Sequence, residues 1–264
     1  MMGPAHSLSG AAAWLAAGAA AAALDHPMPW PVLLAGALVC SGAALAPDLD
    51  HKSATISRAF GPLSRALCGV IDKISESVYN ATRNKGERRR SGGHRTLTHT
   101  WPWALFLGAG FSAGAVLGGR WAVLVILFIH MVLAVEGLLW RAARVSSDVL
   151  VWLLGATSAW TLAGVLDKPG NGSDWLFTSP GQEYLWLGLP IVLGALVHNI
   201  GDAITISGCP ILWPVAIGGK RWYPLGTPKF MRFRAGAWVE TRLLMPLFMV
   251  IGGAGGLVAL GVIG

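Results

Sequence analysis

The sequence predicts an all-α membrane protein, a polytopic transmembrane bundle of about seven spans that forms one domain over residues 1–264. Three observations predict this fold. Hydrophobic residues make up 54% of the chain. Charged residues make up only 12%, roughly half the share in an average soluble domain. The mean hydropathy is +0.56. Together they exclude a soluble enzyme and a disordered protein, and three widely spaced cysteines exclude a disulfide scaffold.

Seven apolar stretches approach the length of about 20 residues that a helix needs to cross a bilayer. Glycine and proline within them are tolerated, because transmembrane helices contain more of both than soluble helices do. The first stretch is short and rich in alanine, but no Lys or Arg precedes it, which disfavours a cleaved signal peptide. The predicted spans are 8–24, 31–47, 101–118, 121–140, 150–166, 184–200 and 243–263.

The distribution of positive charge predicts the orientation in the inner (plasma) membrane. Loops on one side of the seven spans hold 18 of the 20 Lys and Arg residues, and the other side holds only Arg120 and Lys168. Positive loops stay in the cytoplasm, so the N-terminus is predicted to be cytoplasmic and the C-terminus external. The net charge of +7 therefore indicates topology and a membrane-lipid partner, with no nucleic acid. The oligomeric state is left open.

The cytoplasmic segment 48–100 is predicted to contain an amphipathic helix at about 56–78 and a basic loop at 83–95. Apolar residues from Ile56 to Val78 recur at spacings of three and four, so they share one helix face. Such a helix lies in the membrane interface or covers what lies beneath it, and Gly61-Pro62 kinks or starts it. The basic loop attracts anionic lipid or an anionic substrate, or only sets the topology.

Histidine and aspartate gather at the predicted cytoplasmic ends of the spans. Because the topology rests on Lys and Arg alone, this convergence is an independent indication of a site. A lone histidine at a span end is more often an interface residue, but here four separate segments contribute. These residues are His6, then Asp48, Asp50 and His51, then His94 and His99, and finally His198 and Asp202.

The spacings suit a metal centre. His198 and Asp202 are four residues apart and share one helix face, and Asp48 and His51 are three apart. His94 and His99 are five apart, so one is predicted in a loop and the other in a first helical turn. Imidazole and carboxylate suit zinc, with manganese or iron as alternatives.

The ligands outnumber those of one tetrahedral ion, so two or more metal ions are predicted. Such a centre activates water and clamps a phosphoryl oxygen. We predict Asp50 as the catalytic base and Arg95 as the group that binds a substrate phosphate.

Other readings of these residues remain open. His130 lies within a span, where a helix–helix hydrogen bond is the commoner explanation, and Glu136 either enters the site or pairs with Arg141. A divalent-metal transporter is the main alternative, although transporters usually bind ions near the bilayer midplane and contain internal repeats. A noncatalytic protein with a structural metal is another, although such sites are usually closed by four ligands.

The order of these strings resembles the LexA-regulated, inner-membrane predicted metal-dependent hydrolases, the YdjM-like family. The resemblance rests on Pro47-Asp48-Leu49-Asp50-His51, on His94-Arg95-Thr96-Leu97-Thr98-His99 and on His198-Asn199-Ile200-Gly201-Asp202, and it continues to Glu240. It implies a membrane-bound hydrolase distantly similar to zinc-dependent phospholipase C.

That resemblance implies His6, Asp48 or Asp50, His51, His94, His99, His198 and Asp202 as metal ligands, with Glu240 as a weaker candidate. Ala235 and Ala237 depart from the small polar residues that the family shows before this glutamate. The expected function is hydrolysis of a lipid or lipid-linked phosphoester at the cytoplasmic face.

Overall fold

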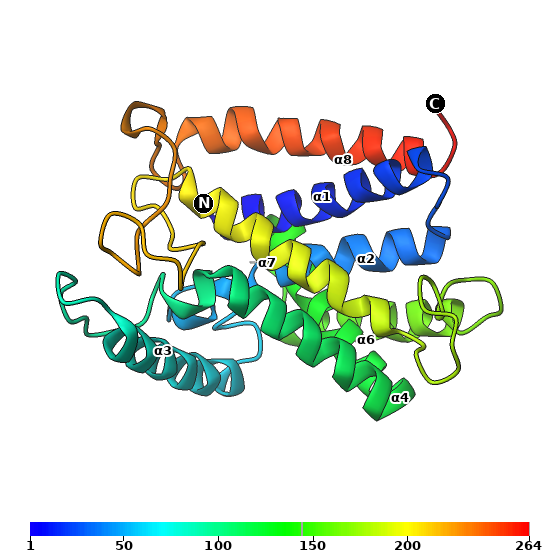
Figure 1. The fold of residues 1–264 in the computed structure, drawn as a ribbon. Coiled ribbons are helices and arrows are strands. Elements are labelled where there is room, and N and C mark those ends of the chain that lie inside the picture. Colours follow the sequence, from blue (N-terminus) through cyan, green and yellow to red (C-terminus); the bar gives the residue numbers. More distant parts are fainter. Residues whose placement is uncertain (144, 264) are drawn as a thin grey trace.

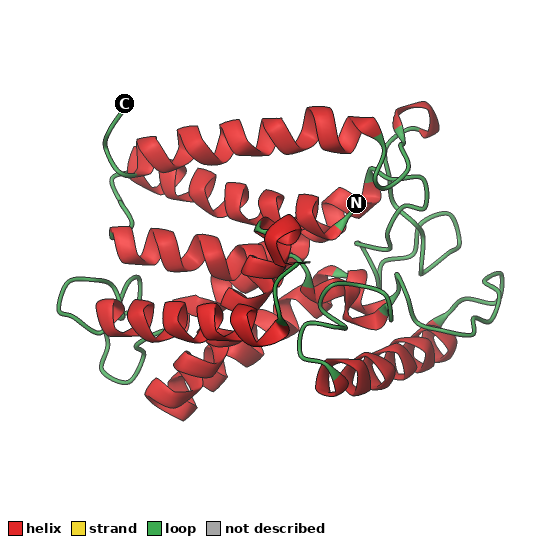
Figure 2. Cartoon of the chain, turned by 180° about the vertical axis from the view of Figure 1, so that it is seen from behind, coloured by secondary structure: helices red, strands yellow, loops and turns green. Residues whose placement is uncertain are grey.

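The computed structural model describes residues 1–143 and 145–263 (Figure 1). Within these residues the regular elements are helical and the β-type pairings are isolated bridges, so the all-α class is confirmed (Figure 2). The α-helices are α1 (Gly3–Ala23), α2 (Trp30–Ala43), α3 (Pro62–Thr82), α4 (Trp101–Leu138), α5 (Trp140–Ala143), α6 (Asp148–Leu166), α7 (Gly188–Ala203) and α8 (Met245–Ala259). The shorter segments are η1 (Ala46–Asp50), η2 (Leu97–His99), η3 (Leu185–Leu187), η4 (Lys229–Met231) and the π-helical η5 (Glu240–Leu244).

The element α4 contains two of the predicted spans and folds back on itself. Gly119 interrupts it with φ 56° and ψ −149°, a left-handed backbone that glycine adopts without a Cβ clash. The ring of Phe111 lies 5.3 Å from that of His130, whereas 19 residues of straight helix would separate them by about 28 Å. The chain therefore reverses at Gly119, between the predicted spans 101–118 and 121–140.

Five helices in the described residues are long and apolar enough to cross a membrane, so the predicted count of about seven is not confirmed. Two differences account for the lower number. The element α4 is counted once although it folds back, and α1, which covers the predicted span 8–24, is not among the five. The five are Trp30–Asp50, Trp101–Leu138, Asp148–Leu166, Leu185–Ala203 and Glu240–Ala259.

The two ends of the bundle differ in what they carry. The N-terminus, η1, α3 and the long loop between α7 and α8 lie at one end (Figure 1). The connection between α1 and α2, the loop that follows α6 and the C-terminus lie at the other end (Figure 1). The predicted basic segments therefore share one end of the molecule, which is also where α7 ends.

Helix α2 lies at the centre of the bundle, and glycines let its neighbours approach it closely. A Cβ built at Gly10 of α1 or at Gly194 of α7 would lie 2.5 Å from the Cys40 carbonyl oxygen. Small residues at such contacts allow helix backbones to pack together in membranes. This packing places α7 directly against the end of α2 that leads into η1.

We expect Gly194→Ala to destabilise the protein and to weaken metal binding. The new methyl group would meet backbone atoms of Cys40 and Ala44, which cannot rotate away, and overpacking of this kind costs about 1–3 kcal/mol. A thermal unfolding scan and a metal titration measure both effects. Gly253→Ala is the matched control, because nothing lies within 4 Å of a Cβ there. Equal melting temperatures for the two variants would contradict this account of the packing.

The amphipathic helix exists, but it begins later than predicted. Gly61 has φ 59° and Pro62 is the first helical residue, so this pair starts α3. Ile56 and Phe60, predicted within the helix, lie in the turns before it, where Phe60 packs against Phe128 and Trp152.

The apolar face of α3 points away from the protein. Leu63, Leu67, Val70 and Ile74 are exposed, whereas Ser64, Cys68, Ser75 and Tyr79 are buried. Each set recurs at spacings that place it on one side of the helix. The polar side of α3 therefore packs on the rest of the chain.

Candidate metal centre

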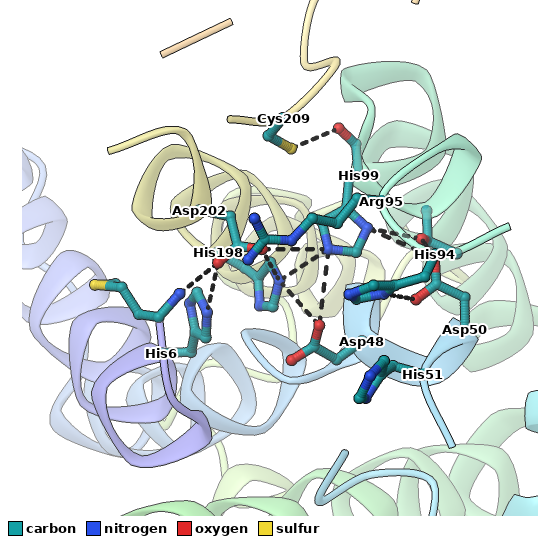
Figure 3. Close-up of polar contacts among 12 residues, drawn as sticks. His6, Asp48, Asp50, His51, His94, Arg95, His99, His198, Asp202 and Cys209 are labelled. Carbon is teal, nitrogen blue, oxygen red and sulfur yellow. Dashed lines mark hydrogen bonds and ion pairs between the residues drawn. The ribbon is translucent and has the colours of Figure 1, made fainter. Parts of the chain in front are cut away.

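Four side chains from three segments converge at the end of the bundle that carries the basic loops. Asp48 lies on η1, the turn that follows α2, and His99 ends η2, immediately before α4. His198 and Asp202 lie four residues apart on the last turns of α7, so both point to the same side. One ligand atom from each of the four lies within 4.8 Å of all the others. Figure 3 shows the four side chains pointing toward one another.

The distances between these atoms suit one small divalent cation. Nε2 of His99 lies 3.3 Å from Nε2 of His198, and each lies 3.7 Å from Oδ1 of Asp48. Oδ2 of Asp202 lies 3.6 Å from His99 Nε2 and 3.8 Å from His198 Nε2. Ligands about 2.0–2.1 Å from a tetrahedral zinc ion are separated by about 3.3 Å. The distance between the two imidazole nitrogens matches this value, and the four distances from imidazole to carboxylate are about 0.3–0.5 Å longer.

Hydrogen bonds on the outer side of each imidazole orient its inner nitrogen. Nδ1 of His198 lies 2.7 Å from the Ala44 carbonyl oxygen, which can only accept, so Nδ1 carries the proton. The Thr98 hydroxyl donates to Asp50 Oδ2 at 2.5 Å, which leaves its oxygen to accept from His99 Nδ1 at 2.9 Å. Both Nε2 atoms therefore present a lone pair to the cluster, as metal ligands do.

This arrangement needs a positive charge at its centre. Two nitrogen lone pairs face each other at 3.3 Å between two carboxylates, and such groups repel one another unless a cation lies between them. Burial disfavours a charged His99, but the carboxylates of Asp202, Asp48 and Asp50 outweigh burial and raise its pKa to about 9, so without a metal ion a proton on His99 supplies this positive charge. The residues present therefore fit a divalent metal.

Asp202 joins the cluster to Arg95 and to His6. Nη2 of Arg95 lies 2.7 Å from Oδ2 of Asp202, and Nη1 donates to the Thr205 hydroxyl at 3.2 Å. Oδ1 of Asp202 faces His6 Nε2 at 3.3 Å and also contacts the Met1 amino group. The two oxygens of this carboxylate thus face opposite sides.

His6 comes from a different helix, α1, and is fully buried. Its ring stacks on that of His198, with centroids 3.7 Å apart. Nδ1 has no hydrogen-bond partner, and Nε2 has only the 3.3 Å ion-pair contact with Asp202 Oδ1. A buried polar group without a partner is costly, so His6 marks a place where a ligand would be favourable.

Asp50, His94 and His51 form a second group beside the first. Asp50 is buried, and its Oδ1 lies 2.9 Å from His94 Nδ1. The His51 ring lies 4.4 Å from the ring of His94, and its own Nδ1 contacts Ser53. Asp50 lies 3.7 Å from His99 Nδ1, on the side of that ring that faces away from the cluster.

A cavity of about 300 Å³ opens beside the two groups. Asp48, His51, His94 and Arg95 lie on its wall with apolar side chains that include Leu45 and Ile56. The volume is at the lower end of the range for small-molecule sites. One residue of the four-residue cluster, Asp48, and two half-buried histidines, His51 and His94, therefore face the same space.

The family model of the YdjM inner membrane proteins matches residues 1–263. The chain belongs to this family. It is accordingly an inner membrane protein, and its apolar helices are able to cross a membrane. No curated protein and no solved structure matches the chain, so a similarity to zinc-dependent phospholipase C is not shown.

Within this YdjM-family chain Glu240 lies outside the four-residue cluster. It is buried at the start of η5, where Oε1 accepts from the Met2 backbone N–H at 2.5 Å and Oε2 from the Gly236 N–H at 2.7 Å. A carboxylate at the start of a helix favourably compensates the helix dipole. Glu240 thereby holds the first turn of α1, the turn that leads to His6.

The structure also identifies residues that sequence reasoning did not assign to the site. The Thr98 hydroxyl forms hydrogen bonds with both Asp50 and His99. Thr205 accepts a hydrogen bond from Arg95, and the Ala44 carbonyl oxygen orients the His198 ring. Thr98 lies inside the string from His94 to His99, so its position was a usable signal. A backbone carbonyl has no sequence signal, because every residue has one.

Proposed function

We propose that the protein is a metal-dependent hydrolase that cleaves a phosphoester of a membrane lipid or lipid-linked headgroup. The observation that carries the proposal is the convergence of Asp48, His99, His198 and Asp202 beside an open cavity. Of these four residues Asp48 lines the cavity, and His94 lines it too. A structural metal needs four ligands but no cavity, whereas a catalytic metal needs space for a substrate. Arg95 at the same cavity suits a phosphate group.

Zinc is the cation that we propose, with manganese or iron as alternatives, because the four donors are two imidazoles and two carboxylates. When bound, the cation supplies Lewis acidity, which polarises a phosphoryl oxygen and makes water a stronger acid. A second ion belongs to the proposal as well. The donors nearest to a second ion are His6 and Oδ1 of Asp202, where the Met1 amino group now contacts the carboxylate and the ion would replace it.

The geometry favours a division of roles between Asp50 and His94. Both oxygens of Asp50, the predicted base, are engaged by His94 and Thr98. Asp50 therefore orients His94, with the proton on Nδ1 and the lone pair of Nε2 available as a base. We assign proton transfer to His94, which reaches the cavity, and a positioning role to Asp50.

We place the site at the cytoplasmic face, with seven crossings if the two limbs of α4 and helix α1 each span the bilayer. The observation in favour is that the basic loops and the metal ligands share one end of the bundle (Figure 1). Labelling of Lys85→Cys and Lys168→Cys from the two sides of the membrane tests this orientation, because the three native cysteines are buried.

A turnover assay tests the function. Protein purified in mild detergent without chelator is expected to release headgroups from a panel of fluorescent glycerophospholipids and to stop when a chelator removes the metal. Proteoliposomes loaded with a zinc-sensitive dye serve as the second arm, because a transporter would carry zinc across the bilayer. Zinc flux without hydrolysis would replace the proposal with transport, and neither activity together with bound metal would indicate a structural site.

A further inference from the structure

The basic loop after α3 is held in place by one buried carboxylate. Glu87 is 7% exposed, and its oxygens accept from the backbone N–H groups of Asn84, Arg221 and Trp222 at 2.7, 3.2 and 2.8 Å. Two segments more than 130 residues apart in sequence are thereby joined at one side chain. The loop therefore has a defined structure, whereas the sequence predicts a solvated basic loop that attracts an anionic lipid or substrate or only sets the topology.

Further hydrogen bonds hold the same two segments together. Arg221 Nη1 donates to the Thr82 carbonyl oxygen at 3.0 Å, and Trp222 Nε1 donates to the Thr82 hydroxyl at 3.2 Å. Asn84 Nδ2 donates to the Gly219 carbonyl oxygen at 2.8 Å. These hydrogen bonds therefore hold the loop after α3 and the segment around 219–222 at a fixed distance from each other. A preformed binding site requires such fixed walls.

These walls enclose a cavity of about 380 Å³ that is rich in positive charge. Arg88, Arg90, Arg95 and Lys220 line it, and Glu87 is the one acidic residue among the described residues of its wall. The Glu87 carboxylate is already engaged by backbone N–H groups. In the described part of the chain, ion pairs with a carboxylate involve Arg95 but not Arg88, Arg90 or Lys220.

The cavity also has aromatic walls and a direct link to the metal centre. Tyr79 and Trp222 line it, with ring centroids 5.3 Å apart, and the Arg90 guanidinium lies over the Tyr79 ring. Arg95 lines both this cavity and the cavity beside the cluster, and it contacts Asp202 Oδ2 at 2.7 Å. An anion here would therefore lie one side chain away from a metal ligand.

We propose that this cavity, which we call the cationic cavity, binds the phosphate group of an organic phosphoester. Unpaired guanidinium and ammonium groups favour a phosphate, which accepts several charge-assisted hydrogen bonds. The volume exceeds what a free phosphate ion fills, so a headgroup beside Tyr79 and Trp222 belongs to the ligand. One part of this inference rests on the proposed function: if the protein is a hydrolase, the phosphoester bound in the cationic cavity is its substrate.

Calorimetric titration of the full-length protein tests whether the cationic cavity binds a phosphoester. The detergent contains no phosphate group, and a chelator is present so that no metal ion can bind the probe. The probes are inorganic phosphate, glycerol 3-phosphate, dioctanoyl phosphatidic acid and, as the neutral control, glycerol. We expect Arg88→Gln and Lys220→Gln each to weaken glycerol 3-phosphate binding about tenfold. Lys85→Gln is the control, because it removes the same charge from an exposed position of the same loop that does not line the cavity.

Arg88→Lys is the control for misfolding, because it changes the side chain at the same position but keeps its positive charge. Retained binding in this variant would show that the loss in Arg88→Gln comes from the missing charge. Tighter binding of dioctanoyl phosphatidic acid than of glycerol 3-phosphate would identify a lipid as the source, and equal binding a soluble phosphoester. Unchanged affinity in Arg88→Gln and Lys220→Gln, or an equal loss in Lys85→Gln, would overturn the proposal.

Asp48→Asn separates this inference from the proposed function. It removes a metal ligand but leaves the lining of the cationic cavity intact. Phosphoester binding that persists in this variant would support the inference independently of the metal. Native protein that binds the phosphoester but neither retains metal nor hydrolyses it would contradict the hydrolase alone. Metal binding and hydrolysis together with unaltered phosphoester binding in the cavity variants would contradict the inference alone.

Discussion

His99→Ala is expected to lower metal affinity by at least about a hundredfold, so that the purified variant retains little metal. Its Nε2 is one of the four converging donors, and loss of an outer partner alone costs about 10–100-fold in metal sites. Elemental analysis of protein purified without chelator gives the metal content, and a competition titration gives the affinity.

Two further variants are compared with His99→Ala, one with a smaller expected loss of metal affinity and one with none. Thr98→Val keeps the shape but removes the hydroxyl that bonds Asp50 and His99 Nδ1, so we expect a loss of about 10–100-fold in affinity. His26→Ala is the matched control, because His26 is exposed and lies just after α1, at the other end of the bundle. Metal content that is the same in His99→Ala and His26→Ala would show that the cluster is not the binding site.

His94→Gln is expected to lower kcat by about 10²–10⁴-fold while the metal content stays close to that of the native protein. His94 lies outside the four-residue cluster but reaches the cavity, and positioned acid–base groups contribute a rate factor of this size. The assay is turnover of the phosphoester that the lipid panel identifies, with metal content measured on the same samples.

Asp50→Asn tests the positioning role of that carboxylate. The amide can donate as well as accept, so it no longer holds the proton on His94 Nδ1, and we expect a loss in kcat with little change in KM.

His26→Gln is the control for the substitution of His94 by glutamine. Loss of metal in His94→Gln would instead make His94 a ligand, and unchanged kcat would remove it from the mechanism.

Much of the fold follows from composition and periodicity. The apolar stretches are helices, Gly61-Pro62 starts α3, and the segments predicted to lie together share one end of the bundle. The predicted number of about seven spans is not confirmed. Whether the two stretches around Gly119 count once or twice depends on one backbone conformation, which hydropathy does not report.

The candidate site was predictable in its chemistry and less so in its grouping. His198 and Asp202 act together because they are four residues apart on one helix, a relation visible in the sequence. His94 and His99 are neighbours in one string, yet His99 joins the four-residue cluster and His94 pairs with Asp50. Their separation arises from the turn at 94–96 and the short helix η2, whose side-chain directions no spacing rule predicts.

The sequence by itself determined the residue types and the end of the molecule where they gather, because hydrophobic length and Lys and Arg placement are local properties of the chain. The tertiary structure alone decided which lone pairs meet. The inward direction of His198 Nε2 depends on the Ala44 carbonyl of another helix, and the cationic cavity depends on Glu87 reaching Trp222. Such contacts join residues more than a hundred positions apart, and only close packing of the folded chain creates them.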